Sequence, residues 1–194
     1  MTSDSSVVAE SVTRPTVFGE LFHRHAAGIR RYVMRRAGES IADDVVSETF
    51  LIAFQKRASY DLEHPDARPW LYGIATNLIH RRRVAEARVL RTLERTPLDP
   101  HTVDLSTDVD ARIDATRKLR EVARSLRRLS SGDRDCILLY AWADMSYEQV
   151  SLALGIPVGT VRSRINRARR SLRLAMKEIE EDGYGRAHIA TDPA

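Results

Sequence analysis

The spacing of apolar residues restricts this chain to an all-helical fold. From about residue 16 to about residue 181, apolar side chains recur three and four positions apart, which places them along one face of an α-helix. No stretch shows the sustained alternation of apolar and polar residues, bounded by turn dipeptides, that is typical of β-strands. A chain of 194 residues has room for two small domains but not for a large catalytic barrel. We therefore predict an all-α protein of two small domains.

Changes in composition mark the limits of these domains. Residues 1–15 and 182–194 show no helical period and are expected to be loose tails. Residues 92–112 are acidic and rich in Thr, Pro and Asp, which is typical of a flexible linker. The linker separates a first helical domain over 16–91 from a second, four-helix domain over 113–181.

Composition also excludes several classes of protein. No apolar run approaches the roughly 20 residues that a membrane span needs, and the N-terminus lacks the basic and apolar stretches of a secretory signal. We therefore expect a cytoplasmic protein without membrane insertion. The one cysteine, Cys136, can form no internal disulfide and leaves no cysteine-rich zinc site. Cys136 lies on an apolar helix, where we expect its side chain to be buried. We expect no cofactor.

Positive charge is concentrated in two places. The formal net charge is only +4, but Arg81, Arg82, Arg83, Arg88 and Arg91 stand close together in the first block. The second block carries a run of cations with no acid among them: Arg162, Arg164, Arg167, Arg169, Arg170, Arg173 and Lys177. Two separate basic blocks indicate a polyanion that is contacted twice, although either block alone fits a solvated helix face equally well.

The segments SYEQVSLALG and IPVGTVRSRINRARRSLR have the layout of a helix-turn-helix. Ser146 and Gln149 form a capping-box pattern that opens a short helix, and Gly155 ends it before a longer basic helix begins. Four apolar residues of the longer helix share one face: Val161, Ile165, Ala168 and Leu172. This pattern predicts that they pack in the core.

The opposite face of that helix suits base recognition. Its outward residues near the N-terminus are Arg162, Ser163, Asn166 and Arg167. Arg pairs with guanine, Asn with adenine and Ser with either, and the N-terminal part of such a helix enters a major groove. Arg164, Arg169 and Arg170 flank this face and suit phosphates. The alternative is a helical hairpin with a solvated Arg face.

Three segments resemble one protein family. The stretch LREVARSLRRLSSGDRDCILLYAWADMSYEQVSLALGIPVGTVRSRINRARRSLRLAM resembles the fourth domain of bacterial sigma factors of the sigma-70 family, in its extracytoplasmic-function (ECF) group. IADDVVSETFLIAF resembles the helix of this group that binds core RNA polymerase, and RPWLYGIATNLIHRRR resembles its minus-ten reading helix. Only the linker stands between the blocks, where larger sigma factors have a third domain. We therefore expect a member of this small group.

The resemblance implies a role for the exposed face of the helix over about 41–56. Asp44, Ser47, Glu48 and Leu51 would bind the coiled coil of the polymerase β′ clamp, with the carboxylates meeting basic side chains. The second domain would bind the β flap and read a minus-thirty-five element. The acidic linker is either the family's connector toward the polymerase active centre or a simple tether.

The resemblance also implies a surface for the minus-ten element. It would combine the loop over about 59–68 with one face of the following helix, and its residues would be Tyr60, Asn77, His80, Arg81, Arg82 and Arg83. Tyr60 could stack on an extruded base, whereas Trp70 is expected to pack in the core. The three Arg residues would contact backbone phosphate.

We thus expect an initiation factor that binds core RNA polymerase and promoter DNA and is not an enzyme. The family also implies a regulator, often an anti-sigma factor. One alternative is a stand-alone helix-turn-helix regulator that binds duplex DNA by itself. Another is a DNA-processing enzyme with a metal on Asp43, Asp44 and Glu48, although no further ligand is placed to complete such a site.

Overall fold

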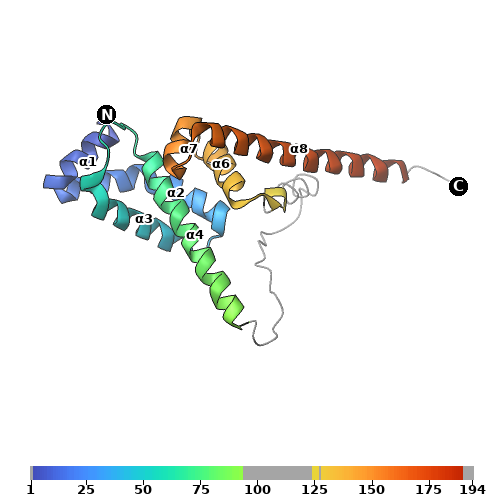
Figure 1. Cartoon of the computed structure of the whole chain (residues 1–194), viewed down its shortest axis with the longest axis horizontal. Helices are drawn as coiled ribbons and strands as arrows, with labels where there is room; N and C mark the ends of the chain where they lie inside the picture. The colour runs from blue at the N-terminus through green and yellow to red at the C-terminus, as the bar shows by residue number, and fades with distance from the viewer. Residues whose placement is uncertain (1, 94–123, 127, 190–194) are drawn as a thin grey trace. The chain divides into compact units, whose positions relative to one another are not determined.

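All regular secondary structure in the part of the chain that the structure describes is helical, which confirms the predicted fold class. A computed structural model describes residues 2–93, 124–126 and 128–189. In chain order the elements, coloured from blue to red in Figure 1, are α1 (Asp4–Thr13), η1 (Pro15–Phe18), α2 (Gly19–Ala37), α3 (Ala42–Lys56), η2 (Arg57–Ser59), α4 (Arg68–Leu93), α6 (Ser131–Trp142), α7 (Tyr147–Leu154) and α8 (Val158–Ile189). The predicted linker lies outside the described residues, except where α4 continues to Leu93.

Packing divides the described chain into two compact units. The first contains the helices up to Leu93 together with Leu139–Ile156, and the second contains the described residues from 124 to 138 and those from Pro157 onward. No helix in the described ranges is both long and apolar enough to cross a membrane.

The core of the first unit lies between α2, α3 and α4. Its fully buried side chains include Leu21 and Ile29 of α2, Val45 of α3, and Leu71 and Ile79 of α4. They recur at helical spacing, so each helix buries one apolar stripe and leaves its other face to solvent. This packing fixes which faces of α3 and α4 are available for binding.

The N-terminal segment is helical, which corrects the expectation of a loose tail over 1–15. Ser3 caps α1 by accepting a hydrogen bond from the backbone N–H of Ser6 at 3.1 Å, and Val7 and Val8 are buried. The helix contacts η1, η2 and α2. Its apolar residues are too few to show a helical period in the sequence, and the helix is stabilised by tertiary contacts instead.

Helix α7 packs on α4 within the first unit. Gly73 permits a close approach, because a Cβ there would lie 2.5 Å from the carbonyl oxygen of Ala153. The Gln149 side chain also donates to the Asp66 carboxylate at 2.9 Å. Contacts thus group α7 with the first unit, whereas the sequence assigns it to the second domain over 113–181. That domain boundary remains a prediction.

The second unit is built on α8 and most of α6. Ser130 caps α6, since its hydroxyl accepts from the backbone N–H of Asp133 at 3.1 Å. Buried side chains of this unit are Cys136, Ile137, Leu138, Val161, Ile165 and Ala168. Helix α8 continues to Ile189, and so reaches into the segment expected to be a tail over 182–194. The helix includes Gly183 and Gly185. An isolated glycine weakens a helix but does not by itself end one.

Candidate nucleic-acid and polymerase-binding surfaces

Helix α8 separates its buried and exposed residues as its spacing predicts. Of the four residues predicted to pack in the core, Val161, Ile165 and Ala168 are fully buried and Leu172 is half-buried. The predicted recognition residues are exposed: Arg162, Ser163, Asn166 and Arg167. Arg170 is exposed as well. The buried stripe therefore anchors the helix and leaves the predicted base-reading face open to a ligand.

The turn that leads into α8 is well defined by hydrogen bonds. The predicted capping box is present: the Ser146 hydroxyl accepts from the Gln149 N–H at 3.2 Å, and the Gln149 side chain accepts from the Ser146 N–H at 2.9 Å. Gly155 ends α7 with φ +62°, in the left-handed region that favours glycine. The layout of a short helix, a turn and a longer helix thus matches the expectation.

Two of the predicted α8 cations contact residues of α6 inside the second unit. Arg167 makes a bidentate contact with Asp133, at 2.8 and 3.2 Å, and this guanidinium lowers the pKa of the Asp133 carboxyl. The Arg164 guanidinium lies beside Gly132, where a Cβ would be 2.7 Å from Nη1. Sequence reasoning missed both partners, because α6 and α8 are far apart in the chain. Arg162, Ser163 and Asn166 are left as the more accessible part of the face.

The basic block on α4 is divided between different surfaces. Asn77 and Arg81 are exposed. Arg82 instead reaches the acidic residues of α3, with its guanidinium 3.1 Å from Glu48 and 3.5 Å from Asp44. Arg83 donates to the carbonyl oxygen of Arg36 at 2.9 Å, and His80 is half-buried.

The predicted polymerase-binding residues share one side of α3. Asp44, Ser47 and Leu51 are exposed and Glu48 is half-buried. Leu51 keeps 55% of its surface exposed, which is high for an aliphatic residue beside a core. Carboxylates around an exposed leucine suit a partner with basic and apolar side chains. Among the described residues there is no group of three His, Cys, Asp or Glu side chains that could hold a metal ion.

The loop between η2 and α4, residues 60–67, is ordered by its own side chains. The Tyr60 hydroxyl donates to the carbonyl oxygen of His64 at 2.7 Å, and its ring lies 4.8 Å from that of Trp70. Burial raises the pKa of Tyr60 to about 12. The Tyr60 ring, predicted to stack on a base, therefore already has an aromatic neighbour within the protein.

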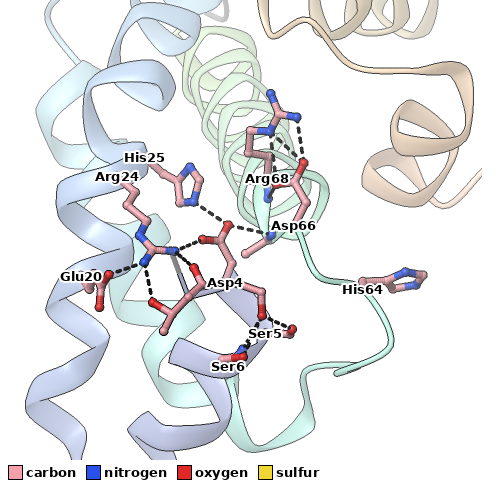
Figure 2. A network of polar contacts seen from close by, with 12 residues as sticks. Asp4, Ser5, Ser6, Glu20, Arg24, His25, His64, Asp66 and Arg68 are labelled. Atoms are coloured by element: carbon pink, nitrogen blue, oxygen red, sulfur yellow. Dashed lines mark hydrogen bonds and ion pairs between the residues drawn. The ribbon is translucent and has the colours of Figure 1, made fainter.

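Asp4 of α1 joins this loop to α2, a contact that no pattern in the sequence predicts. Figure 2 shows its carboxylate between Arg24 and His25 on one side and the loop backbone on the other. Arg24 also contacts Glu20, and Asp66 contacts Arg68 at the start of α4. His64 points away from the network.

Comparisons with known proteins point to one family. Residues 21–89 match "Sigma-70 region 2" and residues 119–172 match "Sigma-70, region 4". The ECF RNA polymerase sigma factor SigL of Mycobacterium tuberculosis is 33% identical over 162 residues, which cover 82% of this chain and 88% of SigL. The RNA polymerase sigma factor NccH of Alcaligenes xylosoxydans xylosoxydans is 31% identical over 160 residues, covering 80% of this chain and 84% of NccH.

Solved structures show the same fold. The structure of CnrH in complex with the cytosolic domain of CnrY aligns with a TM-score of 0.64 and 27% identity, over 90% of this chain and 97% of CnrH. The sigma factor RpoE of Bartonella quintana, solved with the anti-sigma factor NepR, also aligns with a TM-score of 0.64, over 82% of this chain and 96% of RpoE, at 21% identity.

Proposed function

Because this chain belongs to the ECF group of the sigma-70 family, we propose that its surfaces divide the recognition of a promoter between them. The chain directs promoter-specific transcription initiation, with core RNA polymerase and promoter DNA as its partners. Sigma factors are initiation factors, and the chemistry is carried out by the polymerase. The observation that carries this conclusion is the presence of both sigma-70 regions in one chain, together with its similarity to an ECF sigma factor over most of both chains.

The first part of the proposal assigns polymerase binding to α3. Asp44, Ser47, Glu48 and Leu51 contact the coiled coil of the β′ clamp, and the second domain contacts the β flap. The exposure of Leu51 and the carboxylates beside it support this assignment. A basic side chain of the clamp would compete with Arg82 for these carboxylates.

The second part assigns the minus-thirty-five element to α8. Arg162, Ser163 and Asn166 read base edges, and Arg170 contacts phosphate. The exposure of these four residues supports the assignment. In the free chain Arg167 pairs with Asp133 and the Arg164 guanidinium lies against Gly132, so DNA phosphates would compete with these contacts for the two side chains.

The third part assigns the minus-ten element to the 60–67 loop and α4. Opening a promoter exposes single-stranded DNA, which needs a basic surface and a place for an extruded base. Asn77, His80 and Arg81 lie on α4, the helix that follows the loop, and Arg81 supplies an exposed cation. Tyr60 supports the loop from within. We also propose control by a protein regulator, since CnrH was solved with CnrY.

Transcription in vitro from a mixed promoter library tests the proposal. Core RNA polymerase is assayed with the unmodified chain, without it, and with an Asp44→Arg/Glu48→Arg variant. New start sites that require the unmodified chain are the expected result, and the double variant should lose them. Duplex binding by the chain without any core-dependent initiation would overturn the proposal in favour of a stand-alone regulator.

A further inference from the structure

Helix α1 is tied to both sides of the 60–67 loop. At its start, the backbone N–H of Asp4 donates to the carbonyl oxygen of Pro65 at 3.0 Å, and the Asp4 carboxylate accepts from the N–H of Ala67 at 3.0 Å. Toward its end, the carbonyl oxygen of Ser11 accepts from the guanidinium of Arg57, in η2, at 3.1 Å. Helix α1 thus binds η2, which precedes the loop, and also the last residues of the loop.

Asp4 is built into this position as a buried anion. Only 7% of its surface is exposed, and both carboxylate oxygens are used: Oδ1 accepts from Arg24 at 2.8 Å, and Oδ2 lies 2.7 Å from Nε2 of His25. Arg24 also donates to the carbonyl oxygen of Thr2 at 2.9 Å. A buried charge is tolerated where it is paired on every side, so the side chain has one well-defined orientation.

The outer side of the loop is left open. Residues 61–65 are all exposed, whereas Ala67 is buried and Tyr60 is half-buried. The exposed stretch includes the carboxylates of Asp61 and Glu63. Carboxylates repel phosphates but can accept hydrogen bonds from the amino groups of bases, so this surface suits a base edge better than a DNA backbone.

We propose that Asp4 is a positioning residue for the capture of an extruded minus-ten base. It holds the backbone at Pro65 and Ala67, and residues 61–65 therefore keep one shape before DNA arrives. A loop that is already ordered loses little conformational freedom on binding, which strengthens binding. This inference rests on the proposed function, in which the 60–67 loop receives the base.

Binding of single-stranded DNA to the complete complex with core polymerase tests the inference. The library transcription supplies a promoter, and the probe is a fluorescent single-stranded oligonucleotide carrying the minus-ten element of that promoter. The variants are Asp4→Ala, Asp4→Asn and, as a control on the same helix, Glu10→Gln. The Glu10 carboxylate pairs with Arg14, one turn along the same helix.

We expect Asp4→Ala to raise Kd for the probe about 10-fold, in line with the loss of one base contact. Its preference among bases should become weaker at one position of the probe. Asp4→Asn keeps an acceptor for the Ala67 N–H and should lose less, and Glu10→Gln should bind like the unmodified chain. All variants should bind core polymerase equally.

An Asp4→Ala complex with unchanged affinity and base preference would overturn the inference. So would a loss that is equal for every base and accompanied by weaker core binding, because Asp4 would then support only the fold. If Asp4→Ala does not fold, the comparison of Asp4→Asn with Glu10→Gln decides in the same way. Failure of the unmodified complex to bind the probe at all would instead refute the proposed function.

Discussion

Replacing Arg82 by Gln tests how the two proposed surfaces of the first unit are related. The sequence assigned Arg82 to promoter DNA, but in the structure its guanidinium lies 3.1 Å from Glu48 and 3.5 Å from Asp44, two residues proposed to bind polymerase. The partner's basic side chains must displace Arg82 to reach these carboxylates. Arg82→Gln removes that competitor, so we expect tighter binding to core polymerase.

The structure limits the size of this effect. Asp44 keeps 73% of its side-chain surface exposed and Glu48 keeps 43%, and exposed ion pairs contribute about 0.2–1 kcal/mol each. Both pairs share one guanidinium, so their contributions do not simply add. We expect a gain of at most about 1 kcal/mol, equivalent to a Kd lowered by up to roughly fivefold. The gain should shrink as salt rises, because exposed pairs are screened.

Fluorescence competition for core polymerase measures this change, with Arg81→Gln as the matched control. Arg81 is the exposed neighbour on α4, and its replacement should leave core binding unchanged. It should weaken promoter binding and reduce the salt dependence of that binding by about one unit of slope. Weaker core binding by Arg82→Gln would refute the reasoning, since Arg82 would then be orienting the carboxylates for the polymerase.

Four further results are expected. Arg162→Ala should lower the favourable free energy of binding to a cognate upstream element by about 1–3 kcal/mol in a binding titration, while Arg170→Ala should weaken binding to all sequences alike. Unaltered promoter choice by Arg162→Ala would contradict the assignment of this face to base reading. Ser146→Ala removes the capping box of α7 and should lower the free energy of unfolding in urea by about 0.5–2 kcal/mol, whereas Ser146→Thr should retain most of it. Burial opposes the charge on Asp4, but hydrogen bonds from Ala67 and Arg24 outweigh this effect and lower the pKa of the Asp4 carboxyl. The ionised carboxylate therefore stabilises the folded chain above the unfolded carboxyl pKa of about 3.9, and this stabilisation is lost as pH falls through the lower folded value. In urea titrations from pH 7 to pH 3, the free energy of unfolding should decline less for Asp4→Asn than for the unmodified chain. Burial raises the pKa of the Cys136 thiol to about 11, so iodoacetamide at pH 8 should modify it only in denaturant, and rapid modification of the folded chain would place it on the surface.

The helices could be predicted from the sequence wherever an apolar stripe runs through them. Gly155 ends α7 as expected, and the alternation of buried and exposed residues on α8 follows directly from its spacing. Helix α1 could not be predicted in this way. Its first residue is anchored through contacts with residues 24, 25 and 67, and no local pattern records contacts over such separations.

The sequence predicts which residues lie on the proposed binding surfaces, but not which of their side chains are already paired with other residues of the chain. Charge patterns identified Arg82 and Arg167 as cations for DNA, and the structure pairs both with carboxylates from other helices. A sequence shows that a cation is outside the apolar stripe, but not whether an acid from another helix reaches it. Asp133 and Glu48 are such acids here.

The alternation along α8 has a consequence for how such proteins diverge. The residues that anchor the helix, Val161, Ile165 and Ala168, are distinct from the exposed residues Arg162, Ser163 and Asn166. Substitutions at exposed positions typically change stability by less than about 0.5 kcal/mol. If this face reads the promoter as proposed, a duplicated gene could therefore acquire a new promoter preference through a few changes on it while its product still folds, and a bacterium could separate its regulons in that way.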